Sequence, residues 1–191
     1  MKLKTFLLTS LLTVSAMAAD NNAAQPLNVK QEGIKYIKML GGALKSELKA
    51  QMKADKSGMA ALGFCTAKAN EITENINKKL PSYAKVRRTA LRVRNDKNNR
   101  ADTIDQKVMK DYVAAIEAKT FTPKDIKVVQ DGDTTRVYKP LVAKAVCLKC
   151  HGTNLSEEIT KSLDTNYPHD HAVGFKEGDL RGVIVSEIKK H

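Results

Sequence analysis

The stretch from Ile126 to Tyr138 reads IKVVQDGDTTRVY, and it indicates the fold more clearly than any other part of the chain. Two short runs rich in Val and Thr flank the residues QDGD at 130–133. β-branched residues favour strands, and an Asp-Gly pair between two such runs favours a tight hairpin turn. The stretch therefore predicts two antiparallel strands, over residues 126–129 and 134–138.

Further elements are expected on both sides of this hairpin. Towards the C-terminus, residues 181–188 are rich in Val and Ile and predict a last strand. Towards the N-terminus, residues 86–94 alternate in character, which predicts a strand with one basic face. Between these two strands, Asp102 precedes apolar residues at helical spacing, so we expect a helix that ends near Lys119.

The N-terminal half of the chain is expected to be helical. Apolar positions recur in steps of three or four over residues 28–53, with lysines on the other face, which predicts an amphipathic helix. A second periodic run predicts a helix over residues 59–79, ended by Pro81. Helices first and antiparallel strands later indicate an α+β fold. We expect residues 28–191 to form this single domain.

The first residues have the pattern of an export signal. Lys2 and Lys4 precede an apolar run that ends in small residues around Ala19, as in a cleavable secretory signal peptide. The run is too short to span a bilayer, which takes roughly 20 apolar residues. We therefore expect residues 1–19 to be removed, residues 20–27 to form a mobile lead-in, and the mature protein to lie in the periplasm.

Composition and charge restrict the class of protein. Of the 191 residues, 42% are hydrophobic and 28% charged, which excludes a globally disordered chain. The formal net charge is +12, and it becomes +10 without the two lysines of the signal. Because an exported chain rarely meets nucleic acid, we expect this basic surface to attract an acidic redox partner or an anionic membrane surface.

The chemistry of the chain is concentrated in residues 147–151, which read CLKCH. A C-x-x-C-H run is the attachment signature of a c-type haem. Cys147 and Cys150 would each form a thioether to the porphyrin, and His151 would bind the iron as an axial ligand. A zinc site would need a second pair of ligands, and a redox dithiol usually opens a helix in a βαβ unit; the sequence has neither. Since the motif occurs once, we expect one covalently bound haem.

The third cysteine, Cys65, has no thiol partner left once the motif binds haem. It lies on the apolar stripe of the second predicted helix, so we expect its side chain to point inward. In an oxidising compartment a free thiol is protected either by burial or by binding the iron. The residues alone leave the second axial position open between Cys65, His169 and His171, with Met59 and Met109 as further candidates.

Several segments together resemble a known family. They read RTALRVRNDKN at 88–98, CLKCHG at 147–152, YPHDHAVGF at 167–175 and GDLRG at 178–182. In these segments the chain is similar to PAS-like single-haem c-type cytochrome domains, a family catalogued as a haem-binding domain of unknown function. The resemblance implies long N-terminal helices on a PAS-like antiparallel sheet, with the haem between helix and sheet. It also implies a cysteine early in the second helix as the second axial ligand, which favours Cys65 over His169 and His171.

The remaining features point to a carrier or a sensor. Arg88, Arg92 and Arg94 are candidates for contacts with the haem propionates, because a guanidinium pairs with a carboxylate through two hydrogen bonds; the alternative is a solvated strand face. No catalytic pair of carboxylates, nucleophile triad or phosphate-binding glycine loop is present, so we do not expect an enzyme. We expect electron transfer or redox sensing by an exported monohaem cytochrome. The alternatives are a haem-based gas sensor that signals through a separate partner and, less favoured, a peroxidase-type enzyme.

Overall fold

The computed structural model describes residues 28–95, 99–122 and 124–190. The expected signal peptide and lead-in, residues 1–27, lie outside the described residues. The described elements are α1 (Val29–Ala54), α2 (Met59–Ala67), α3 (Ala69–Asn77), β1 (Ala84–Thr89), α5 (Thr103–Glu117), β2 (Lys127–Asp131), β3 (Thr134–Val142), the 3₁₀ turn η1 (Ala145–Cys147), α6 (Leu148–His151), α7 (Glu157–Asn166) and β4 (Leu180–Lys189). Among these helices, none combines the length and the apolar character that crossing a membrane requires.

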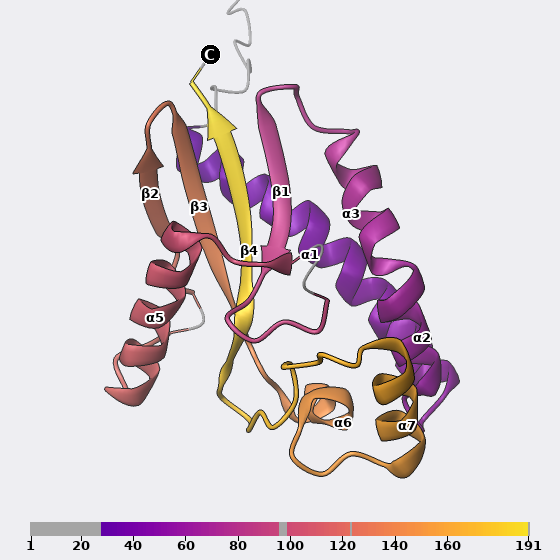
Figure 1. The fold of residues 1–191 in the computed structure, drawn as a ribbon. Helices are drawn as coiled ribbons and strands as arrows, with labels where there is room; N and C mark the ends of the chain where they lie inside the picture. Colours follow the sequence, from indigo (N-terminus) through magenta and orange to yellow (C-terminus); the bar gives the residue numbers. More distant parts are fainter. Residues whose placement is uncertain (1–27, 96–98, 123, 191) are drawn as a thin grey trace, which may run out of the picture.

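Four antiparallel strands form one sheet in the order β1-β4-β3-β2 (Figure 1). The predicted hairpin is confirmed, and Asp131 pairs with Thr134, so that Gly132 and Asp133 make a two-residue turn. Gly132 has a φ of 55°, a left-handed conformation that glycine adopts without strain. β4 runs between β1 and β3 at the centre of the sheet, so both of its edges are paired with neighbouring strands.

The two faces of the sheet are covered by different helices. α1 lies across one face and α5 lies against the other (Figure 1). Successive side chains of a strand point to opposite faces, so Ile184 and Ile188 of β4 pack with α1 while Val183 and Val185 pack with α5. The predicted α+β class, with a long N-terminal helix on an antiparallel sheet, is confirmed.

The long helix α1 begins where the sequence predicts and lies very close to the sheet. Asn28 caps it, accepting a hydrogen bond from the backbone N–H of Gln31 at 2.9 Å. A Cβ atom at Gly33 would lie 2.5 Å from Cγ2 of Val137 on β3, a distance that carbon atoms do not reach. Glycine at this position therefore permits the close contact between α1 and the centre of the sheet.

Two of the predicted elements are wrong in extent. The predicted strand over 86–94 ends at Thr89, where the backbone pairing with β4 stops. Further on, the carbonyl of Val93 accepts from the His171 N–H of a loop at 3.0 Å. The predicted helix over 59–79 is two helices, interrupted at Lys68, whose φ of −110° departs from helical geometry.

Helix α7 was not predicted from the sequence. Ser156 caps its N-terminus, and Ile159 and Leu163 are buried one turn apart. Two glutamates in its first turn are favourable at the positive end of the helix dipole. A serine followed by two acids and two apolar residues four apart is the signal that could have revealed it.

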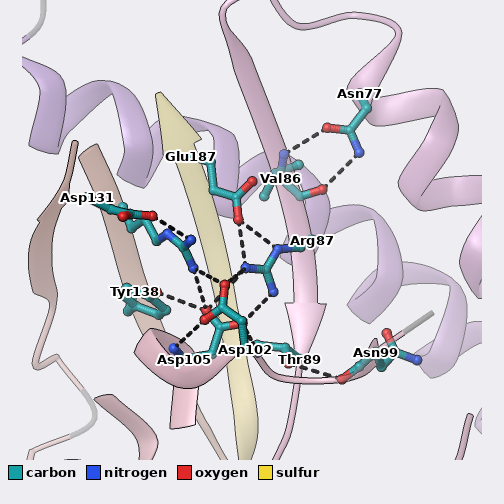
Figure 2. Close-up of polar contacts among 11 residues, drawn as sticks. Asn77, Val86, Arg87, Thr89, Asn99, Asp102, Asp105, Asp131, Tyr138 and Glu187 are labelled. Atoms are coloured by element: carbon teal, nitrogen blue, oxygen red, sulfur yellow. Dashed lines mark hydrogen bonds and ion pairs between the residues drawn. The ribbon is translucent and has the colours of Figure 1, made fainter. Parts of the chain in front are cut away.

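A network of charged side chains fixes the N-terminus of α5 to the sheet (Figure 2). Asp105 is fully buried, and it accepts hydrogen bonds from Arg87 of β1 at 2.8 Å and from the Tyr138 hydroxyl of β3 at 2.9 Å. On the outer edge of β1, the Asn77 side chain bonds to both the N–H and the carbonyl of Val86, at 2.7 and 2.8 Å. β1 is thus held on both sides, which places the residues that follow Arg87.

Candidate functional site

The CLKCH motif forms a short helical segment, η1 followed by α6, at the end of the molecule where α2 and α7 also lie (Figure 1). Cys147 and Cys150 are partly exposed, and the structure shows no disulfide for either of them. Cys150 packs against the apolar cluster of Leu62, Ile159 and Leu163, which belongs to α2 and α7. The motif is therefore positioned by helices that precede and follow it in the chain.

His151 is held in one orientation by the loop that precedes β4. Its Nδ1 lies 2.6 Å from the carbonyl oxygen of Ala172. A carbonyl only accepts hydrogen bonds, so Nδ1 carries the proton and Nε2 keeps its lone pair. The ring of Phe175 contacts the imidazole edge-on, with ring centres 6.3 Å apart. This arrangement leaves Nε2 available to bind a metal, in the manner of histidine ligands whose other nitrogen is fixed by a hydrogen bond.

The surroundings of His151 keep its ring neutral. Burial lowers the pKa of His151 well below its ordinary value of 6.5, and the positive charges of Arg181 and Arg94 lower it further. The hydrogen bond to Ala172 acts in the opposite direction but is the smallest of these effects. A neutral imidazole is the form that binds metals.

Arg94 connects the segment after β1 to the motif. Its Nε donates to Asp170 at 2.8 Å, and its Nη2 donates to the carbonyl oxygens of Cys150 and Ala172. The side chains of Arg94 and Asp170 are only 10% and 8% exposed. Asp170 also accepts from the backbone N–H of Ala172 at 2.7 Å. Arg94 is therefore engaged in fixing the two loops that carry Cys150 and Ala172.

Arg92 and Arg181 both lie against one aromatic ring. Their guanidinium carbons lie 4.1 and 5.3 Å from the centre of the Phe175 ring, within the range of cation–π contacts. Arg92 donates to the carbonyl of His171 at 3.1 Å, and Arg181 donates to the carbonyl of Arg92 at 3.2 Å. Sequence reasoning missed Arg181; a charged residue inside a Val- and Ile-rich strand is the signal that could have found it.

Arg88 is on the other side of β1 from Arg87, where none of the described side chains pairs with it. Successive residues of a strand face opposite ways, so Arg88 shares the face of Val86, which packs with α1. Among the described residues, Arg88 makes no hydrogen bond or ion pair, and its buried Nε has no acceptor. The same is true of Nε of Arg181. Burial lowers the pKa of Arg88, and it lowers the pKa of Arg181 to about 10.

Cys65 is placed near this group, but the prediction that it points into the core is wrong. Its side chain is exposed, whereas Leu62 and Ala69 of the same stripe are buried. The helix is interrupted at Lys68, so the stripe does not continue as one face and the end of α2 is left uncovered.

The charges around Cys65 show which side chains surround it. Surrounding protein atoms partly desolvate the Cys65 thiol and raise its pKa, even though the side chain remains accessible to solvent. The positive charges of Arg88, Arg94 and Arg181 oppose this effect. Cys65 in turn contributes to the raised pKa of Cys150. The structure thus brings together Cys65, the motif and arginines from three separate segments.

The other candidates for a second axial ligand are placed differently. His169 and His171 are exposed, and His171 lines a separate cavity of about 340 Å³ together with residues of the β1–α5 segment and α5. Met109 is fully buried against the opposite face of the sheet. Met59 packs against the cluster that also contacts Cys150. Cys65, by contrast, lies where the positive charges of Arg88, Arg94 and Arg181 act on its thiol and lower its pKa against the effect of burial.

A larger cavity, of about 650 Å³, lies at the other end of the sheet, between the start of α1 and the end of β4. It is lined by Val29, Glu32, Lys35, Tyr36, Pro81, Tyr83, Gln130, Thr135, Ile188, Lys189 and Lys190. It contains no residue of the motif, so size alone does not identify the functional site.

Comparison with known proteins agrees with this architecture. No curated protein matches the sequence. A solved structure, described as the crystal structure of the cyanobacterial heme-protein Tll0287, is similar to the chain with a TM-score of 0.57 and 20% sequence identity. The similarity covers 83% of this chain and 92% of that chain, and at this identity it shows a shared fold. The family model of the Tll0287-like proteins matches residues 10–188, and the chain therefore belongs to the Tll0287-like family.

Proposed function

We propose that this protein binds haem and is an exported monohaem c-type cytochrome that acts in electron transfer or redox sensing. The observation that carries the proposal is the convergence, at one end of the fold, of Cys65, the CLKCH motif and arginines without carboxylate partners. The similar solved structure is that of a haem-protein, which supports haem as the ligand.

Cys147 and Cys150 are the residues that would attach the haem. They are three residues apart in a helical segment, so both thiols project from the same side of it. Each thiol would add its S–H across one vinyl group of the porphyrin, which forms a C–S bond without loss of atoms or net transfer of electrons. When bound, the haem would supply an iron that gains and loses one electron.

His151 and Cys65 are the proposed axial ligands. The hydrogen bond from Nδ1 of His151 to Ala172 leaves Nε2 as the donor atom and fixes the plane of the ring. Burial raises the pKa of the Cys65 thiol, and three guanidinium charges around it reduce that rise. They thereby act in favour of the thiolate, which is the form that binds metals. A thiolate ligand donates electron density and stabilises the ferric state, so we expect a low reduction potential for a c-type cytochrome.

The arginines of the site fit a ligand that carries carboxylates. A buried guanidinium without a partner is costly, because it has lost its water without gaining an anion. Nε is buried without an acceptor in Arg88, Arg136 and Arg181, but Arg136 has Asp102 and Asp131 as ion-pair partners. Arg88 and Arg181 form no ion pair with the described residues, and Arg181 donates only to the carbonyl of Arg92. The haem propionates are two carboxylates on one edge of the porphyrin, and they would satisfy such groups with charge-assisted hydrogen bonds.

Attachment is tested by acid–acetone extraction and denaturing electrophoresis of protein produced with export and a c-type maturation system. We expect the haem to remain with the polypeptide. The Cys147→Ser/Cys150→Ser double variant is the control, and it should lose its haem on extraction. Haem that extracts freely from the unmodified protein would overturn the c-type assignment.

Ligation by Cys65 is tested with Cys65→Ala, compared with Thr66→Ala as a neighbouring control. We expect the ferric spectrum to change from low-spin to high-spin, or to a bis-histidine form if His169 or His171 replaces the thiolate. The reduction potential should rise, because the electron-donating ligand is gone, while covalent haem remains. An unchanged ferric EPR spectrum and potential would refute the ligand assignment.

The choice between carrier and sensor depends on Cys65 in the reduced protein. An electron carrier keeps both axial ligands in both oxidation states, whereas a redox or gas sensor releases Cys65 on reduction and opens a site for CO or NO. A peroxidase-type enzyme would instead need an open position with acid–base groups. Spectra of both oxidation states, recorded with and without CO, separate these roles.

An acidic redox partner and a periplasmic location complete the proposal. The outward side of α1 carries exposed lysines spaced so that they follow one stripe of the helix, namely Lys38, Lys45, Lys49 and Lys53. Such a stripe attracts acidic proteins or an anionic membrane surface. If the export signal is cleaved as expected, mass spectrometry of the periplasmic fraction should give a chain that begins at Asp20.

A further inference from the structure

We propose that Arg88 and Arg181, and not Arg92 or Arg94, form the site that holds the haem carboxylates. This inference rests on the proposed function, because it names the residues that would receive the propionates of the bound haem. Of the three arginines that the sequence suggests, the proposal keeps Arg88 and leaves out Arg92 and Arg94. It adds Arg181, which the sequence pattern does not single out.

The other buried arginines of the protein show what a paired guanidinium looks like. Arg87 donates to Asp105 at 2.8 Å and to Glu187 through Nε, also at 2.8 Å. Arg136 donates to Asp102 and, at 2.6 Å, to Asp131. Both therefore have carboxylate partners within the protein, and Figure 2 shows those of Arg87. Among the described residues, neither Arg88 nor Arg181 forms an ion pair with a carboxylate; Asp170, which is paired with Arg94, acts on Arg181 only from beyond ion-pair distance.

Arg94 and Arg92 are already committed to protein groups. Arg94 has its own carboxylate, Asp170, and its Nη2 donates to the backbone carbonyls of Cys150 and Ala172. Its positive charge is thus balanced by Asp170, and its Nε and Nη2 groups are engaged by the protein. Arg92 is exposed, so water can solvate it, and it is also bound to the carbonyl of His171 and stacked on Phe175. Neither guanidinium needs a further anion.

Arg88 and Arg181 come from neighbouring strands and lie near one another. β1 and β4 pair through Arg88 and Ile184, and Arg181 precedes Ile184 by three residues on β4. Arg181 is fixed by its bond to the Arg92 carbonyl and by its position on Phe175, the ring that contacts His151. The positive charges of Arg88, Arg92 and Arg94 all act against that of Arg181, and Asp170, already paired with Arg94, offsets only part of this repulsion. An anion between or beside Arg88 and Arg181 would therefore stabilise both.

The experiment uses the haem-loaded protein and its variants Arg88→Gln and Arg181→Gln. Lys85→Gln removes a positive charge from an exposed position on the same strand as Arg88 and is the matched control. Two readouts are measured: the reduction potential, and the resonance Raman bands of the propionate bending vibrations, which report the hydrogen bonds of the carboxylates directly.

We expect each Gln variant to lower the potential, because loss of a cation beside the carboxylates leaves more negative charge near the iron and favours the ferric state. At a fixed ambient potential, the ratio of reduced to oxidised protein should fall by roughly threefold to tenfold, or about 30–60 mV at 59 mV per tenfold change. The propionate bands should shift in both variants. Arg88→Lys and Arg181→Lys should retain most of the potential, and Lys85→Gln should change neither readout.

Two results would overturn the assignment. The first is that neither the reduction potential nor the propionate bands change in Arg88→Gln and Arg181→Gln. Water alone would then satisfy the two Nε groups. The other is a shift of the propionate bands in Arg92→Gln but not in Arg181→Gln. If a Gln variant does not fold, the corresponding Lys variant still reports on the bands. Failure of the proposed function is distinct, since the unmodified protein would then carry no covalent haem.

Discussion

The ion pair between Arg94 and Asp170 is the contact whose removal we expect to weaken the site most. Asp170→Asn preserves the size of the side chain and the oxygen that accepts from the Ala172 N–H. The amide nitrogen then faces Nε of Arg94, so a donor meets a donor where a 2.8 Å bond was. The guanidinium, only 10% exposed, is left without a negative charge beside it.

The size of the effect follows from burial and from the remaining contacts. Removing one partner of a buried ion pair costs about 3–5 kcal/mol, because the other charge stays buried. Arg94 keeps its bonds to the carbonyls of Cys150 and Ala172, so we expect the lower end, about 3 kcal/mol. At roughly 2–4 °C per kcal/mol for a chain of this size, Tm should fall by about 6–12 °C. A domain stable by about 5–15 kcal/mol stays folded.

Urea unfolding followed by circular dichroism measures this loss, since the chain has no Trp to report by fluorescence. Asp164→Asn, which neutralises an exposed carboxylate on α7, should change stability by less than about 0.5 kcal/mol. In a double-mutant cycle with Arg94→Met, the two substitutions should not be additive. A loss below about 1 kcal/mol for Asp170→Asn, or additive losses in the cycle, would refute the reasoning.

Three further predictions concern α1, the start of α2 and the net charge. Gly33→Ala should destabilise the protein by about 1–2 kcal/mol, because overpacking against Val137 outweighs the gain in helix propensity. Gly42→Ala has open space around it and should stabilise the protein by up to about 1 kcal/mol. Tm values of the two variants that shift in the same direction would contradict this reasoning. The hydrogen bond from the backbone N–H of Ala60 lowers the pKa of Asp55 from its ordinary 3.8 to about 2. The ionised Asp55 carboxylate therefore stabilises the folded state above about pH 4, and this stabilisation is lost as the pH falls towards 2. The difference in Tm between the unmodified protein and Asp55→Asn should narrow over that pH range. Finally, association of the mature chain with an acidic redox protein should weaken as salt rises, and stopped-flow rates indifferent to ionic strength would count against a basic docking surface.

Local pattern was enough to predict much of the framework. The stripe of α1, the Asp-Gly hairpin and the Val- and Ile-rich last strand were all found where expected, because each depends on residues close together in the chain. The CLKCH motif is likewise local, since its thiols and imidazole lie within one helical turn. The capped start of α5 at Asp102 follows from the same kind of short-range hydrogen bonding.

The sequence by itself thus determined the fold class and the residues of the motif, and the tertiary structure decided what surrounds them. The alternation that predicts a strand over 86–94 is real, but beyond Thr89 the backbone finds its hydrogen bonds in a loop some 80 residues later. The same distant contacts neutralise Arg94, leave Arg88 and Arg181 without carboxylates, and leave Cys65 uncovered at the end of α2. Periodicity reports which face of one element is apolar; it carries no information about which charge from another segment will meet a given side chain, and that pairing determines the chemistry of this site.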